Sequence, residues 1–208
     1  KVGGDRAGGL MPGSDALSGF ESRLEGAVAS FGEQHRVPGI VAGVVLDQDL
    51  VWTGSVGYAD LETGSPMDDT RLFRIASITK TLVATAIMQL RDEGRLSLDD
   101  SLVEHVPEFG VVRDPFGPIH TVTLRGLLTH TSGLQYVAPP ADARDPHAND
   151  DGLVTREKVL ERLDRTAIVI PPGTWKYSNL AYELLGEVVR RVGGPSLGGY
   201  VKAHILGP

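Results

Sequence analysis

Ser77 and Lys80 lie three residues apart in the segment Ser77-Ile78-Thr79-Lys80, at the start of a strongly periodic apolar stretch. On a helix, side chains three residues apart share one face, with Cβ atoms about 5–6 Å apart. A serine hydroxyl is a weak nucleophile until a neighbouring group takes its proton, and a partly desolvated lysine can do so. The pair therefore predicts a serine nucleophile that is activated by a lysine.

The same two residues have a structural alternative, in which Ser77 caps a helix and Lys80 is a solvated helix residue. The apolar pattern behind them favours the functional interpretation, because it predicts a buried central helix on which a lysine is out of place. The stripe consists of Ile78, Leu82, Val83, Ala86, Ile87 and Leu90. Gly94 is the predicted end of this helix.

A second polar group is the tripeptide Tyr177-Ser178-Asn179, which follows Pro171-Pro172-Gly173 and precedes a predicted helix over 179–192. Tyrosine can carry protons where a nearby cation lowers its pKa, and an asparagine amide can both accept and donate hydrogen bonds to a substrate amide. Taken alone, the tripeptide is more typical of an ordinary helix start. Together with Ser77 and Lys80, it indicates a second part of one active site.

Several segments in a fixed order carry a resemblance to a known family. They are Ser77-Ile78-Thr79-Lys80, His130-Thr131-Ser132-Gly133-Leu134, Pro172-Gly173 with Tyr177-Ser178-Asn179, and Leu184-Leu185-Gly186. The ordered set resembles the class C β-lactamase-like serine hydrolases, a superfamily of β-lactamases, D,D-carboxypeptidases, D-aminopeptidases and related esterases. The resemblance covers about residues 20–208.

The resemblance implies a role for each of four residues. Ser77 would be the acylated nucleophile, Lys80 would help to deprotonate it, and Tyr177 would carry protons between nucleophile and leaving group. Asn179 would hold the acyl amide of the substrate. The implied substrate is a small molecule or peptide with an ester or amide carbonyl, including a β-lactam or a D-alanyl peptide, with esterase or peptidase activity favoured. No metal or organic cofactor is implied.

Two departures from the family pattern concern the later part of the site. The spacing from Gly173 to Tyr177 is one residue shorter than the family pattern, and the third motif, Lys-Thr-Gly or His-x-Gly, does not occur in the chain. The last residues, Leu206-Gly207-Pro208, resemble the middle of a family segment. We therefore expect a C-terminal polypeptide of the same protein to complete the sheet and to supply an oxyanion-hole donor besides the Ser77 N–H. An inactive binding protein or a non-functional fragment is the alternative.

Ser196 offers a rival nucleophile, because Gly194-Pro195-Ser196-Leu197-Gly198 matches the Gly-x-Ser-x-Gly elbow of α/β-hydrolases. That motif requires a strand before the serine and a helix after it. Here an amphipathic stretch over 184–192 precedes it and indicates a helix instead. Ser196 is therefore predicted to be the N-cap of the final helix.

His130 could be combined with Ser77 in a Ser-His-Asp triad. The favoured alternative is that His130 ends a short helix, where a cation suits the helix dipole and a side chain can cap free carbonyls. The other histidines are scattered without ligand spacing, so no metal site is predicted. They are His35, His105, His120, His147 and His204.

The elements that must position these residues predict an α+β fold of the three-layer αβα type, with an antiparallel sheet and a helical region. Helical spacing extends from Phe20 to Gly32, and strands over 39–46 and 50–58 read as a hairpin. Only these two strands are predicted, apart from a possible short strand near 119–122. Thr123 and Thr155 are predicted helix N-caps.

The predicted organisation has a flexible Gly-rich tail over 1–19 and one domain portion over 20–208. Residues 20–75 would form the helix and hairpin of the α/β part, and residues 76–208 a mainly helical part. The stretch 138–152 is rich in Pro, Asp and Ala and is predicted to be an exposed loop.

Composition limits the function classes. The chain has 208 residues, 41% of them hydrophobic, and a net charge of −7. The negative charge excludes a typical nucleic-acid-binding protein. There are no cysteines, which removes disulfides and cysteine nucleophiles. No apolar run approaches the roughly 18 residues of a membrane span, and no signal peptide is visible, so the sequence leaves the compartment open.

Overall fold

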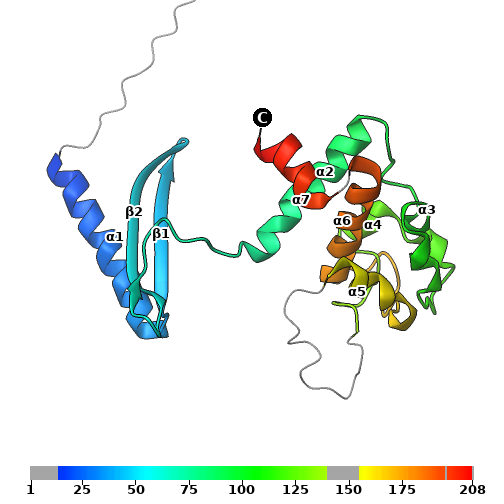
Figure 1. Cartoon of the computed structure of the whole chain (residues 1–208), viewed down its shortest axis with the longest axis horizontal. Coiled ribbons are helices and arrows are strands. Elements are labelled where there is room, and N and C mark those ends of the chain that lie inside the picture. The colour runs from blue at the N-terminus through cyan, green and yellow to red at the C-terminus, as the bar shows by residue number, and fades with distance from the viewer. Residues whose placement is uncertain (1–13, 140–154, 195, 208) are drawn as a thin grey trace, which may run out of the picture. The chain divides into compact units, whose positions relative to one another are not determined.

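The computed structural model describes residues 14–139, 155–194 and 196–207. The chain divides into two compact units, Lys1–Arg74 and Ile75–Pro208. The first unit contains a helix and a small antiparallel sheet, and the described part of the second is built from helices and helical turns (Figure 1). Helices and antiparallel strands together confirm the predicted α+β class.

The first unit packs one helix on a hairpin (Figure 1). Its elements are α1 (Ser14–His35), β1 (Gly39–Leu46), β2 (Asp49–Asp60) and β3 (Ser65–Pro66), and the strand order is β1-β2-β3. Gly32 of α1 faces Ile40 of β1 and Val56 of β2, which pair with each other in the sheet. Trp52 is the one buried hydrophobic side chain of the described strands, so α1 and the hairpin share a small core.

The helix α1 begins at Ser14, whereas the sequence predicted a flexible tail up to residue 19. Residues 14–19 belong to the helix, and the prediction missed them because the apolar periodicity on which it rested begins only at Phe20. Residues 1–13 lie outside the described part.

The hairpin confirms the predicted strands, and a third short strand corrects the prediction of only two. β1 has the predicted bounds, and β2 starts one residue earlier and ends two residues later than predicted. The Asp60 side chain accepts hydrogen bonds from the N–H groups of Glu62 and Thr63 at 2.8 and 3.2 Å. Gly64 adopts a φ of 67°. This side-chain-closed turn returns the chain along β2 and forms β3.

The second unit has eleven helical elements in its described residues. They are η1 (Ala76–Ile78), α2 (Thr79–Asp92), α3 (Leu102–His105), η2 (Pro107–Val111), η3 (Ile119–Thr121), α4 (Leu124–Leu128), α5 (Arg156–Glu161), η4 (Leu163–Arg165), α6 (Asn179–Gly193), α7 (Leu197–Val201) and η5 (Lys202–Leu206). The prediction of a short strand near 119–122 is wrong. Thr121 N–H bonds to Pro118 O at 2.9 Å and closes the short turn η3 there.

The core of the second unit lies where α2 and α6 pack against each other (Figure 1). The predicted stripe of α2 is buried at Val83, Ala86, Ile87 and Leu90. Its first member, Ile78, is exposed because it lies in η1, before α2 begins. Gly94 has a φ of 70° and follows the last turn of α2, which confirms the predicted helix end.

The predicted helix caps are confirmed. The Thr123, Thr155 and Ser196 hydroxyls accept backbone N–H bonds at 3.2, 3.4 and 3.0 Å at the starts of α4, α5 and α7. The predicted exposed loop over 138–152 starts with a buried Ala138, and its residues from 140 onward lie outside the described part. Within the described ranges, every helix is too short or too polar to cross a membrane.

Candidate active site

Ser77 sits at the centre of η1, directly before α2. The preceding residue, Ala76, has a φ of 44°, in the left-handed region that costs energy for a residue with a Cβ atom. Ser77 is exposed and Lys80, in the first turn of α2, is half-buried. The tight turn thus presents the hydroxyl at the N-terminal end of α2, where the helix dipole supplies positive potential.

The structure brings the four predicted site residues together. Lys80 Nζ donates a hydrogen bond to Ser77 Oγ at 3.2 Å and another to Asn179 Oδ1 at 2.7 Å. Ser77 Oγ lies 2.7 Å from the Tyr177 hydroxyl oxygen. The serine oxygen therefore has a cation on one side and a phenol on the other, both within hydrogen-bonding reach.

Electrostatics act most clearly on Tyr177. The hydrogen bond with Lys80, followed by the one with Ser77, lowers the pKa of the Tyr177 phenol below its ordinary value of 10. Lys80 Nζ also lies 4.9 Å from the centroid of the Tyr177 ring. A cation beside a phenol stabilises the phenolate, which is the form that can take a proton from Ser77.

The start of α6 positions Tyr177 and Asn179. Ser178 is fully buried and caps the helix, since its hydroxyl accepts from Ala181 N–H at 3.1 Å and donates to Gln135 O at 2.7 Å. Tyr136 O accepts the N–H groups of Asn179 and Leu180, at 2.8 and 3.1 Å. The loop after α4 therefore holds the segment that carries two of the four site residues.

His130 differs from its predicted role. Its Nδ1 accepts a hydrogen bond from Ser178 N–H at 3.2 Å, and its ring lies 4.5 Å from the Tyr177 ring, centroid to centroid. Burial, and next to it the charge of Lys80, lower the pKa of His130 below 6.5. The prediction that His130 ends a short helix is confirmed, because it directly follows Thr129, the C-cap of α4. The prediction that its side chain is a cation that caps carbonyls is wrong, because the half-buried imidazole faces a lysine and accepts from a backbone N–H. The motif His130–Leu134 was visible in the sequence, but its contact with Ser178 was not.

Metal-binding potential is limited among residues 14–139, 155–194 and 196–207. In those ranges no three His, Cys, Asp or Glu side chains gather closely enough to hold a metal ion.

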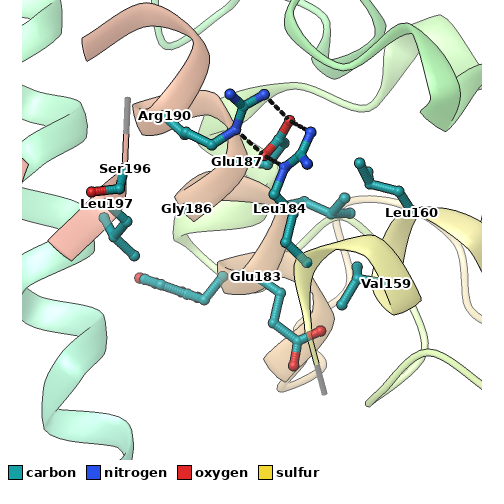
Figure 2. Close-up of a pocket in the computed structure, with 11 residues that line it drawn as sticks. Val159, Leu160, Glu183, Leu184, Gly186, Glu187, Arg190, Ser196 and Leu197 are labelled. Carbon is teal, nitrogen blue, oxygen red and sulfur yellow. Dashed lines mark hydrogen bonds and ion pairs between the residues drawn. The ribbon is translucent and has the colours of Figure 1, made fainter. Parts of the chain in front are cut away.

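Ser196 lies in a different setting. It follows the helix α6, not a strand, and its hydroxyl caps α7 by accepting from Gly199 N–H. It lines a pocket of about 320 Å³ between α5, α6 and α7, with Glu183, Glu187 and Leu197 also in the lining (Figure 2). The strand that a nucleophile elbow needs is replaced by a helix, so Ser196 has the predicted structural role of a cap.

Comparison with known proteins identifies relatives over most of the chain. Residues 24–208 match the family described as Beta-lactamase. Esterase EstB of Burkholderia gladioli is 36% identical over 202 residues, which cover 93% of this chain and 50% of that protein. The chain spans half or less of the length of this and the next curated relatives that it matches.

Solved structures share the fold. The octameric penicillin-binding protein homologue from Pyrococcus abyssi superposes with a TM-score of 0.73 at 34% identity, over 89% of this chain and 42% of that one. A D-stereospecific amidohydrolase from Streptomyces has a TM-score of 0.67 at 32% identity, over 92% and 54%. The chain is thus similar to proteins with different names: an esterase, a penicillin-binding protein homologue and an amidohydrolase.

Proposed function

The chain belongs to the β-lactamase family, and from this we propose that it carries the nucleophile of a serine hydrolase that forms an acyl-enzyme on Ser77. One observation supports this above all: Ser77 Oγ lies within hydrogen-bonding distance of both Lys80 Nζ and the Tyr177 hydroxyl. A hydroxyl between a cation and a phenol of lowered pKa is placed to lose its proton as it attacks a carbonyl.

In the proposed reaction, the Tyr177 phenolate accepts the proton of Ser77 while Ser77 Oγ bonds to the substrate's carbonyl carbon. Lys80 donates to the serine oxygen and stabilises the phenolate. The bond from the carbonyl carbon to the leaving oxygen or nitrogen then breaks, and the leaving group takes the proton from Tyr177. Water then attacks the carbonyl carbon of the acyl-enzyme in the same way: Tyr177 takes the proton of the water and returns it to Ser77 Oγ as the ester bond breaks. This step releases the acid and free Ser77.

Negative charge that develops on the carbonyl oxygen needs donors. We propose the backbone N–H of Ser77 as one of them, at the positive end of α2. The family's third motif does not occur in these 208 residues, and we propose that another part of the same protein supplies it, with the second donor. Removing one such donor typically costs about 10²–10³ in rate. The proposed activity therefore concerns the whole protein.

We propose esters or amides as the substrate class, with esters and peptides favoured over β-lactams. Asn179 Oδ1 accepts from Lys80 at 2.7 Å, which orients the amide so that its NH2 group is the part offered to a substrate carbonyl. An amide donor of this kind suits an acyl-amino group. The named relatives, an esterase and a D-stereospecific amidohydrolase, act on these two bond types.

Covalent labelling tests the proposal. The complete gene product is treated with a fluorophosphonate, and the labelled peptide is identified by mass spectrometry. We expect the label on Ser77, with no labelling of Ser77→Ala and full labelling of Ser196→Ala. Loss of the Ser196 cap should cost only about 1 kcal/mol of stability, so that control should stay folded.

The labelling has two outcomes that would contradict the proposal. Wild-type protein without any label would favour an inactive binding protein, and label on Ser196 would favour the α/β-hydrolase elbow. With Ser77 labelled, hydrolysis rates for p-nitrophenyl butyrate, a D-alanyl-D-alanine peptide and nitrocefin then rank the three substrate types.

A further inference from the structure

We propose that His130 is a positioning residue that fixes Tyr177 beside Ser77, acting as a neutral imidazole that accepts a hydrogen bond from the peptide after Tyr177. This inference rests on the proposed function, because it assigns the residue that holds the proposed proton carrier. The contacts of His130 are with Tyr177 and with the residues on either side of it. We therefore assign His130 no direct role in proton transfer to the substrate.

His130 accepts hydrogen bonds from the residues on both sides of Tyr177. Its backbone carbonyl accepts the N–H of Lys176 at 2.7 Å, and its Nδ1 accepts the N–H of Ser178 at 3.2 Å. The imidazole and phenol rings lie 4.5 Å apart with 34° between their planes. The two hydrogen bonds restrict the backbone on both sides of Tyr177, and the ring contact restricts the orientation of its phenol ring. One histidine therefore fixes both the backbone and the side chain of Tyr177.

The end of α4 places His130 in this position at an energetic cost. His130 N–H bonds to Leu127 O at 3.2 Å and Thr131 N–H bonds to Gly126 O at 2.8 Å, so the chain leaves the helix with His130 at a φ of 58°. Glycine would adopt this left-handed conformation without penalty. A half-buried histidine in a strained position next to the site suggests that the side chain has a function.

The hydrogen bond determines the tautomer. Ser178 N–H can only donate, so Nδ1 must be unprotonated and the imidazole proton must be on Nε2. Protonation of Nδ1 would set two donors against each other and break the contact. The titratable groups around the ring are Lys80 from α2, Tyr177 beside it and Tyr182 from α6, whose ring is 5.2 Å away.

These surroundings predict when the contact is lost. The ring's burial and the Lys80 charge disfavour the imidazolium, so the pKa of His130 lies below 6.5. The hydrogen bond is therefore present at neutral pH and is lost as the pH falls through that lowered value. An extra loss of activity below about pH 6.5 follows, in addition to the effect of protonating Tyr177.

Two substitutions separate the hydrogen bond from the ring. His130→Asn keeps an acceptor at the position of Nδ1 and tolerates the left-handed conformation, but it cannot be protonated. His130→Phe keeps an aromatic ring and removes the acceptor, which leaves the buried Ser178 N–H without its partner. The matched controls are the same two substitutions at His120, an exposed histidine of η3 in the same unit.

The measurement is the rate of fluorophosphonate labelling of Ser77 in the complete gene product, from pH 5 to pH 9, with thermal unfolding of each variant. At pH 8 we expect His130→Phe to be slowed about tenfold or more and His130→Asn to stay within about threefold of wild type. We also expect the extra fall of the wild-type rate below about pH 6.5 to be absent in His130→Asn. The His120 variants should match wild type throughout.

The inference is overturned if His130→Phe is labelled at the wild-type rate, or if His130→Asn shows the same acid fall as wild type. The second criterion remains decisive even if His130→Phe fails to fold. Failure of wild-type protein to label on Ser77 would instead refute the proposed function, so the two failures are distinguishable.

Discussion

The Ser77 hydroxyl oxygen lies 2.7 Å from the Tyr177 phenol oxygen, although 100 residues separate them in the chain. The packing of α2 against α6 brings their N-terminal ends together, and Lys80 bonds to residues from both helices' starts. At this distance a proton can pass directly between the two oxygens, without a water molecule between them.

Tyr177→Phe should lower kcat by about 10²–10⁴, the usual contribution of a general acid or base, with a smaller change in KM. Lys80, and after it Ser77, lower the pKa of Tyr177, so its phenolate forms at lower pH than that of an ordinary tyrosine. The wild-type rate should therefore rise with pH and level off below pH 10. Hydrolysis of p-nitrophenyl butyrate across pH 6–10 measures both effects.

Tyr136→Phe is the matched control for Tyr177→Phe. Its exposed ring lies 6.1 Å from the Tyr177 ring, and its backbone carbonyl, which the substitution keeps, accepts from Asn179. Activity within about threefold of wild type in Tyr177→Phe, or an equal loss in both variants, would contradict the proposed proton transfer.

Glu187→Gln should lower the free energy of unfolding by about 1.5–3 kcal/mol, as expected when a buried carboxylate loses its charge-assisted hydrogen bonds to partly exposed arginines. The Glu187 side chain is 3% exposed and accepts hydrogen bonds from Arg156, Arg190 and Arg191; Figure 2 shows it with Arg190. Urea denaturation measures the change. Glu157→Gln, which removes the charge from an exposed pair with Arg156, should change the free energy of unfolding little.

The contribution of Glu187 should also depend on pH. Despite the opposing effect of burial, hydrogen bonds from the three arginines hold its pKa far below the ordinary value of 4.5. A carboxylate with a depressed folded-state pKa stabilises above the unfolded value and loses that contribution on acidification. The stability gap between wild type and Glu187→Gln should therefore shrink below about pH 4.5. A gap that stayed constant from pH 7 to pH 3 would rule out this network as its source.

Gly133→Ala should destabilise the loop that holds Tyr177 and Asn179. Gly133 has a φ of 75°, and a Cβ atom there would lie 2.2 Å from Ile170 O. Gly94→Ala is the matched control, because Gly94 has a φ of 70° and open space at the Cβ position. Both variants lose about 1 kcal/mol from the backbone conformation, and Gly133→Ala should lose clearly more in urea denaturation. Equal losses would mean that the close approach is unimportant.

Ala76→Gly should leave stability unchanged or raise it by up to about 1.5 kcal/mol. Relief of the left-handed conformation at Ala76 (φ 44°) is worth about 1–2 kcal/mol, and the added flexibility of the unfolded chain offsets about 0.5–1 kcal/mol of it. Ala84→Gly, within α2, has no strain to relieve and should cost about 1 kcal/mol. Thermal unfolding of both variants measures these changes in stability. A loss of stability in Ala76→Gly as large as that in Ala84→Gly would show that Ala76 is not strained.

Local patterns predicted local structure well. The hairpin, the end of α2 at Gly94 and the caps at Thr123, Thr155 and Ser196 follow from side chains that act on backbone within a few residues. The short strand β3 escaped prediction, because two residues carry no periodicity and the pairing depends on the turn that Asp60 closes. The short helix η1 was not predicted either, since an alanine gives no indication that its backbone adopts a left-handed conformation.

By itself, the sequence determined that Ser77 and Lys80 share one side of a helix start, because three residues of separation bring any two side chains together there. Only the tertiary structure decided that Tyr177 completes the contact, and that His130 is an acceptor for Ser178 and not a cation at a helix end. Such contacts depend on how α2, α4 and α6 pack. Packing sums many small interactions over distant residues, so no short segment encodes it.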